Sequence, residues 1–187
     1  GTGYTSIYST SNAFAALAED GSIRAWGYSD WGGSGAPNGT GYTSIYSNLY
    51  AFAALAEDGS IRAWGDSSEG GSGAPNGTGY TSIYSNLRAF AALAEDGSIR
   101  AWGYSSEDGD ARHGYGASGA PNGTGYTSIY STGAAFAALA EDGSIRAWGH
   151  KDQGGMGAPN GTGYTSIYST SYAFAALAED GSIHAWG

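Results

Sequence analysis

One sequence is repeated five times along this chain, and this repetition limits the possible folds more than any other feature. The segments GTGYTSIYS, AFAALAEDGSI and AWG are identical in all five copies. Identical segments need identical surroundings, so we expect one small structural unit per copy, stacked against its neighbours. The chain is expected to form a single domain with repeats at 1–38, 39–76, 77–122, 123–160 and 161–187.

Each unit contains three segments with the composition of β-strands. In the first unit they are YTSIYS (4–9), AFAALAE (13–19) and SIRAWG (22–27). Asp20-Gly21 lies between the last two, and Asp-Gly is typical of a two-residue type I′ hairpin turn. Counting back from such a turn pairs Leu17 with Arg24. The same register brings Glu19 within reach of Arg24 as an ion pair.

Both faces of such a sheet carry apolar side chains, so the sheet must be covered on both sides by its neighbours. Radial repetition of small sheets, as in β-propellers of 4–8 blades, achieves this. We therefore predict an all-β fold, a five-bladed β-propeller of three-stranded antiparallel blades. Because no blade combines strands from both chain ends, an arc of a larger propeller or an open β-repeat array is the alternative. A triangular β-solenoid is disfavoured, because its coils do not double back in hairpins.

The segment ALAEDGSIRAWG resembles the repeat of the regulator-of-chromosome-condensation (RCC1-like) propellers, whose blades carry A-L-x-x-D-G-x-(V/I)-x-A-W-G. The spacing from Trp26 and Gly27 to Gly32 and Pro37 is most similar to the three-stranded blades of the propeller-type β-lactamase inhibitory protein. The resemblance implies the fold rather than one function, because such propellers include exchange factors, inhibitors and surface proteins. The usual N-x-x-G-Q-L-G after Trp-Gly is missing, so no residue is matched to nucleotide exchange.

Apart from His184, which replaces the strand Arg of the other units, the differences between copies lie in two loops per unit, which we expect at one edge of the blades. They are residues 10–12 and their equivalents, and the segments after each Trp-Gly, such as YSDW and the longer YSSEDGDARHGY. Recognition sites are often built from variable loops on a rigid scaffold, although unconstrained drift is the alternative. The partner-binding residues predicted here are of types enriched at binding hot spots: Tyr28, Trp31, Tyr50, Arg88, Tyr104, Arg112, His113, Tyr115, His150 and Tyr172.

Charge and composition exclude several classes of function. Seventeen acidic residues against seven Lys and Arg give a net charge of −10, which disfavours nucleic acid as a partner. No apolar run approaches the roughly 20 residues of a membrane span, so we expect no membrane insertion. The chain has no Cys, and its three His lie in different units. We therefore predict no enzyme activity, no metal and no cofactor.

The function predicted from these features is a non-enzymatic binding module that recognises a protein through the variable loops. A structural repeat segment of a long extracellular or surface array or fibre, with self-association, is an alternative. A multivalent glycan-binding lectin is the second alternative, because near-identical units offer several equivalent clefts.

We expect the chain to be secreted or displayed at a cell surface. Four Asn-Gly-Thr sequons are candidate glycosylation sites, although Pro-Asn-Gly is also ordinary turn chemistry: Asn38, Asn76, Asn122 and Asn160. The chain opens on a repeat boundary without an initiator Met, which suggests a processed or excerpted part of a longer protein.

Overall fold

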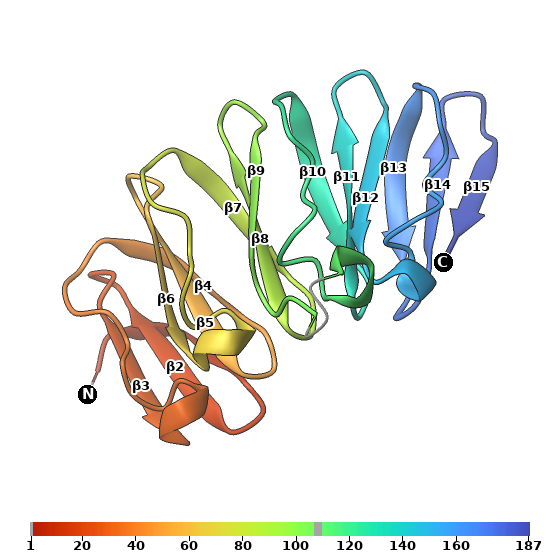
Figure 1. Cartoon of the computed structure of the whole chain (residues 1–187). Coiled ribbons are helices and arrows are strands. Elements are labelled where there is room, and N and C mark those ends of the chain that lie inside the picture. The colour runs from red at the N-terminus through yellow and green to blue at the C-terminus, as the bar shows by residue number, and fades with distance from the viewer. Residues whose placement is uncertain (1, 107–109) are drawn as a thin grey trace.

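The computed structural model describes residues 2–106 and 110–187. Its strands form five separate three-stranded antiparallel sheets, each in chain order, which are the blades (Figure 1). The all-β fold with five three-stranded antiparallel blades of the propeller type is thus confirmed. None of the helices in the described ranges is long and apolar enough to cross a membrane.

The strands of the first blade are β1 (Tyr4–Ser9), β2 (Ala13–Ala18) and β3 (Ile23–Gly27), and those of the second are β4 (Tyr42–Ser47), β5 (Ala51–Ala56) and β6 (Ile61–Gly65). The third blade contains β7 (Tyr80–Ser85), β8 (Ala89–Ala94) and β9 (Ile99–Gly103), and the fourth β10 (Tyr126–Ser131), β11 (Ala135–Ala140) and β12 (Ile145–Gly149). The fifth contains β13 (Tyr164–Ser169), β14 (Phe174–Ala178) and β15 (Ile183–Trp186). Short 3₁₀ turns follow the first four blades: η1 (Ser29–Trp31), η2 (Ser67–Glu69), η3 (Ala111–His113) and η4 (Lys151–Gln153).

The hairpin between the second and third strands has a different register from the one predicted. Leu17 lies opposite Ile23, and Ala16 lies opposite Arg24. The predicted pairing of Leu17 with Arg24 is therefore wrong. Glu19 and Arg24, which are both described, form no ion pair. The other four blades share this register.

The loop geometry at Asp20-Gly21 explains the shift. No described residue other than glycine has a positive φ, so Asp20 cannot occupy the left-handed position that a type I′ turn requires. Gly21, at φ 76°, donates its N–H to the Ala18 carbonyl, and Ala18 donates to the Ser22 carbonyl. This is a three-residue hairpin loop, a type I turn followed by a left-handed glycine. Hydrogen bonds from the Ser22 side chain and N–H lower the pKa of Asp20 below its usual value.

Adjacent blades pack through two unlike apolar faces. One face, which we call the alanine face, consists in the first blade of Ala13, Ala15, Leu17 and Ile23. The other, the aromatic face, consists in the second blade of Ile45, Phe52, Ala54 and Trp64. The Phe52 and Trp64 rings stack with centroids 5.1 Å apart, and small alanines opposite leave room for them. Equivalent residues form the clusters at the other three junctions.

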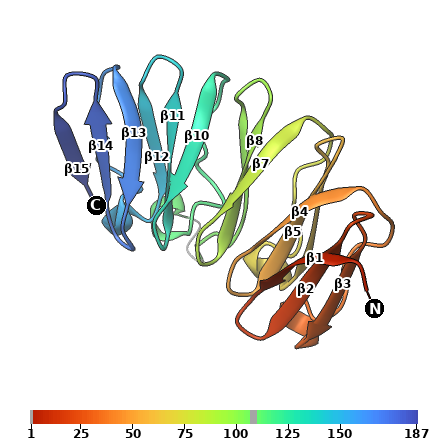
Figure 2. The ribbon, with the colours of Figure 1, turned by 180° about the vertical axis from the view of Figure 1, so that it is seen from behind.

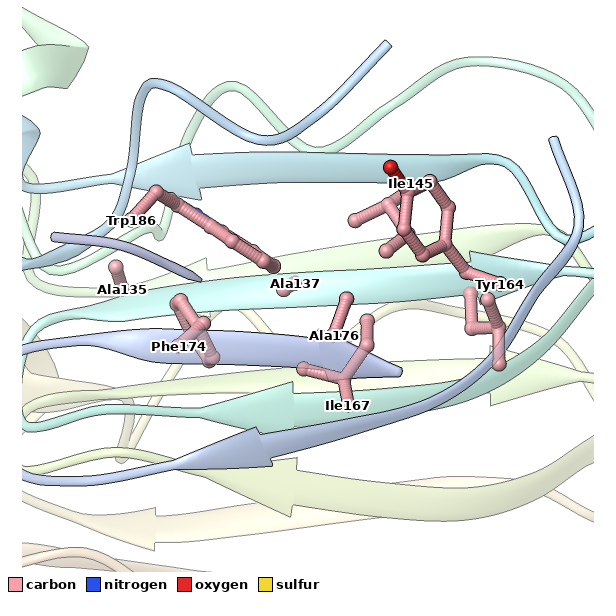
Figure 3. Close-up of a cluster of buried hydrophobic side chains, with 9 residues drawn as sticks. Ala135, Ala137, Ile145, Tyr164, Ile167, Phe174, Ala176 and Trp186 are labelled. Carbon is pink, nitrogen blue, oxygen red and sulfur yellow. The ribbon is translucent and has the colours of Figure 1, made fainter. Parts of the chain in front are cut away.

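Figure 3 shows this packing between the fourth and fifth blades. Phe174 and Ile167 of the fifth blade lie against Ala135 and Ala137 of the fourth. Trp186 completes the cluster at one end of the junction. At the second, third and fourth blades the equivalent phenylalanines are fully buried, so these junctions form the core of the molecule.

Backbone carbonyls complete each junction. The Trp64 indole N–H donates to the Gly32 carbonyl in the preceding loop at 3.1 Å, and Trp102, Trp148 and Trp186 bind equivalent carbonyls. A Cβ on Gly32 would lie 2.6 Å from the Phe52 ring, so the loop needs glycine there to pack closely.

A chain of hydrogen bonds also connects the turns after the first strands. We call it the turn chain; each turn donates an N–H to the next turn's carbonyl, through Ser11, Leu49, Leu87, Gly133 and Ser171.

The five blades form an open arc, with the first and fifth at opposite ends (Figures 1 and 2). Ile7 is 63% exposed, whereas its equivalent Ile45 is 2% exposed. Ile183 is 70% exposed, whereas Ile145 is 3% exposed. The aromatic face of the first blade and the alanine face of the fifth are therefore uncovered. Of the arrangements that the sequence left open, the blades adopt the arc.

Two glycines in equivalent turns provide a test of the junctions. Gly59 and Gly181 both have a positive φ, but a Cβ on Gly59 would lie 2.5 Å from the Gly79 nitrogen of the next blade, whereas Gly181 has nothing within 4 Å. We expect Gly181→Ala to lower the free energy of unfolding by about 1–2 kcal/mol, because of the left-handed backbone alone. Gly59→Ala should lower it by about 1–3 kcal/mol more, because the new Cβ overlaps the backbone of the next blade. Urea unfolding measures both, and equal losses would contradict the packing described.

Candidate functional site

All the variable loops lie at one edge of the blades, which we call the variable rim. It consists of the turns after the first strands (residues 10–12 and equivalents) and the loops after the third strands (residues 28–35 and equivalents). In Figure 1 the turns η1–η4 lie along the lower edge, and the invariant β14–β15 hairpin turn lies at the opposite edge. Backbone hydrogen bonds connect the two sets, as from the Tyr28 N–H to the Asn12 carbonyl.

In the first four blades, a buried polar side chain at the end of the first strand holds the loop that follows the third strand. The Thr10 hydroxyl donates to the Trp31 carbonyl at 3.1 Å, and the Asn48 amide donates to the Glu69 carbonyl at 2.6 Å. Asn86 and Thr132 bind the carbonyls of Tyr115 and Gln153 in the same way. One position of each loop is therefore fixed, although the residue there changes from Trp to Glu, Tyr and Gln.

At the first two junctions the fixed loop residue contacts a variable residue of the next blade. Trp31 meets Tyr50 edge-on, with ring centroids 4.8 Å apart. At the next junction the same two positions are Glu69 and Arg88, which form an ion pair. An aromatic pair at the first junction thus occupies the place of an ionic pair at the second, so we expect the residues at these two positions to depend on each other.

Arg88 lies at the centre of the rim residues that contact one another. Its Nε donates to Glu69 Oε2 at 2.7 Å, and its Nη2 donates to Oε1, which makes a two-point ion pair. The guanidinium carbon also lies 3.9 Å from the centre of the Tyr104 ring. Hydrogen bonding to the nearly buried Glu69 carboxylate raises the pKa of Arg88 above its usual value. Arg88 is therefore a fixed cation that orders the surrounding rings.

The aromatic side chains around Arg88 form a continuous surface, which we call the aromatic belt. Tyr28 packs edge-on against Trp31 at 5.4 Å, and Tyr104 packs edge-on against Tyr115 at 5.6 Å. Arg88 joins the two groups, 5.8 Å from the Tyr50 ring and 5.3 Å from the Tyr115 ring. The belt consists of six of the predicted site residues: Tyr28, Trp31, Tyr50, Arg88, Tyr104 and Tyr115.

The other predicted site residues lie outside the belt. The rings of His113 and His150 are 6.5 Å apart. Arg112 forms an ion pair with Asp110, and its hydrogen bonds lower the pKa of that carboxyl well below its usual value. Tyr172, on the fifth blade, is 67% exposed. Residues 107–109 of the long loop lie outside the described residues.

Glu69 is the rim residue that the sequence analysis missed. It is 4% exposed and forms an ion pair with Arg88. A signal was present, because the two residues of each observed pair are separated by the same interval, residues 31 and 50 in one pair and 69 and 88 in the other.

The side chains of the rim are suited to contact with a partner. Within the described residues no group of three or more His, Cys, Asp or Glu could hold a metal ion. The rim cations Arg88, Arg112 and Lys151 each pair with a carboxylate. The flat aromatic faces of the belt offer apolar area and attraction for a cation.

The coupling of the two rim positions can be tested with the chain's own alternative pair. We expect Glu69→Trp and Arg88→Tyr each to destabilise the protein, because each leaves one partner of a partly buried ion pair alone. The double variant reproduces the Trp31–Tyr50 pair. Its loss of unfolding free energy should be about 1–3 kcal/mol smaller than the sum of the losses in the two single variants. Urea unfolding of the four proteins measures this coupling, and additive effects would show that the positions act independently.

No protein-family model and no curated protein sequence matches the chain. Solved structures match it at low identity. The ectodomain of the Physcomitrella patens receptor kinase CR4 matches with a TM-score of 0.62 at 21% identity, over 98% of this chain and 50% of that one. The CRINKLY WD40 ectodomain of the Arabidopsis thaliana receptor kinase ACR4 matches with a TM-score of 0.63 at 16% sequence identity. The match covers 98% of this chain and 63% of that one.

Prp20p from Saccharomyces cerevisiae, whose structure was described with its binding to Gsp1p and histones, matches with a TM-score of 0.62 at 16% identity, over 98% of this chain and 58% of that one. Yeast RCC1 is the same protein. The chain therefore spans between half and two thirds of the length of these structures. Its blades have the fold of the RCC1-like β-propellers.

Proposed function

We propose that this chain is a non-enzymatic binding module that recognises a protein partner through the variable rim. The observation that carries the proposal is the aromatic belt, in which side chains from loops of three blades meet around one fixed arginine. Ordered aromatic and arginine side chains lose little entropy on binding and are enriched at binding hot spots. Because the rings already contact one another before binding, the belt is a preorganised surface.

The charge of the rim indicates the chemistry of the partner. The rim cations named above are already paired, while the chain as a whole carries a net charge of −10. A partner segment with Lys or Arg side chains next to apolar ones would match both the overall charge and the aromatic faces.

The comparisons support a protein partner and an extracellular position. Prp20p binds Gsp1p and histones, and two of the similar structures are receptor kinase ectodomains. All four sequon asparagines, Asn38, Asn76, Asn122 and Asn160, are exposed, as glycosylation in a secretory pathway would require.

Selection from a random-peptide display library tests the proposal. The wild-type chain should recover peptides with basic and aromatic residues, and Trp31→Ala should weaken their binding at least about tenfold, the usual cost of truncating a hot-spot residue. Met156→Ser is the matched control, because other units carry Ser34, Ser72 and Ser118 at this exposed loop position. Peptides that bind the wild type and Trp31→Ala equally would contradict the proposal.

Glycan binding is a second candidate, favoured by repeated hollows at the edge opposite the rim. A hollow of about 450 Å³ between the first and second blades is lined by Thr5, Glu19, Tyr42 and Glu57. An equivalent one of about 460 Å³ between the third and fourth is lined by Thr81, Glu95, Tyr126 and Glu141. Hydroxyls, carboxylates and a tyrosine ring are side chains that can bind and stack on a sugar, and equal hollows would give avidity.

A glycan array distinguishes this candidate from the first. If the hollows bind sugar, Tyr42→Ser and Tyr126→Ser should each lower the array signal, and together they should lower it more than either alone because avidity is lost. Trp31→Ala should leave the signal unchanged. No signal for the wild-type chain, or a signal that depends only on Trp31, would reject glycan binding in the hollows.

A further inference from the structure

We propose that the two ends of the arc bind a second copy of the chain head to tail. The alanine face of the fifth blade in one copy would pack against the aromatic face of the first blade in the next. This contact uses the end blades and not the aromatic belt, so it is independent of the function proposed for the rim.

The uncovered faces at the two ends are those that every internal junction buries. On the aromatic face of the first blade, Phe14 is 46% and Trp26 is 45% exposed, whereas the equivalent Phe52 and Trp64 are 0% and 4% exposed. On the alanine face of the fifth blade, Ile183 is largely exposed. Each end thus leaves apolar surface in water that a neighbouring blade would cover.

The two faces are complementary because the repeats are identical. Between the fourth and fifth blades, Leu139 and Ile145 pack against Ile167 and Phe174. A junction between copies would bring Leu177 and Ile183 against Ile7 and Phe14, the same residue types at the same positions. The chain already forms this contact four times, so a second copy needs no new complementarity.

The turn chain is also complementary at its ends. Inside the arc each turn N–H donates to the next turn's carbonyl, as from Gly133 to Ser171 at 2.9 Å. Within the described residues, the Ser171 N–H has no acceptor and the Ser11 carbonyl has no donor. In a head-to-tail contact the Ser171 N–H of one copy would lie opposite the Ser11 carbonyl of the next and extend the turn chain.

A second set of backbone groups matches at the opposite edge. At the first junction the Gly41 N–H donates to the Asp20 carbonyl at 3.1 Å, and this bond recurs at the other three. The equivalent Asp180 carbonyl of the fifth blade receives no hydrogen bond from the described chain. In a head-to-tail contact the Gly3 N–H of the next copy would occupy the donor position.

A junction between copies joins two separate chains, so it must offset the translational and rotational freedom that the copies lose, which an internal junction does not. We therefore expect a reversible, concentration-dependent association. The net charge of −10 on each copy opposes it, so added salt should strengthen it.

Two variants, each of which blocks one end, test the proposal. Ile7→Asp places a charge in the aromatic face of the first blade, and Ile183→Asp places one in the alanine face of the fifth. Both side chains are largely exposed in the single chain, so both variants should fold, which circular dichroism checks. Sedimentation of the 187-residue chain over a range of concentrations then gives the masses.

We expect the wild-type mass to rise with concentration to two or more chains, and each variant alone to remain a single chain. An equimolar mixture of the two variants should form a one-to-one dimer and nothing larger, because it holds one intact pair of faces. A single-chain wild type, a single-chain mixture, or a variant that still associates alone through like faces would each overturn the proposal. Met156→Ser and Trp31→Ala should associate as the wild type does, and loss of association in either would place the contact elsewhere.

Discussion

The contact between an alanine face and an aromatic face is the interaction on which the whole structure depends. Burying a side chain such as Phe52 or Ile45 contributes about 1.5–3 kcal/mol, and each junction buries several. The alanines opposite are as important as the rings, because a larger residue at Ala15 or Ala53 would hold neighbouring blades apart. Each blade presents both faces, so a change in one unit alters its fit to two neighbours. This requirement accounts for the invariance of AFAALA in all five copies.

The variable positions of the rim differ between units because the alanine and aromatic faces of the junctions contain none of them. The strands end at buried polar residues such as Thr10 and Asn48, which fix the backbone of the following loop by side-chain hydrogen bonds. Beyond these anchors the belt side chains contact one another, and Tyr115 also packs against the core of its junction. Equivalent positions of the rim hold an aromatic pair at the first junction, Trp31 with Tyr50, and an ion pair at the second, Glu69 with Arg88. The scaffold thus sets where rim residues lie, and the residues themselves set the chemistry of the surface.

The blades and the edge at which the loops vary could be predicted from the sequence, because both follow from period and composition. The hairpin register could not, because Asp-Gly fits both a two-residue turn and a type I turn with a left-handed glycine. The choice depends on packing, since the observed register puts Ile23 beside Leu17 on one face and Trp26 beside Phe14 on the other. The choice between a closed ring and an arc could not be predicted, because closure depends on small angles between blades that no residue type encodes. Most predicted rim residues do meet, but the role of Glu69 depends on a neighbour in the next unit.

The long loop of the third unit shows what the anchors permit. Its first residue, Tyr104, donates its N–H to the Arg88 carbonyl, and the Asn86 amide holds the carbonyl of Tyr115 near its far end. Beyond it, the Gly116 carbonyl still accepts from Trp148, as in the shorter loops. Both ends of the long loop therefore keep the hydrogen bonds that the shorter loops make. A foreign peptide spliced between the two pinned ends would be displayed in the same way, which makes this blade an acceptor site for grafted sequences.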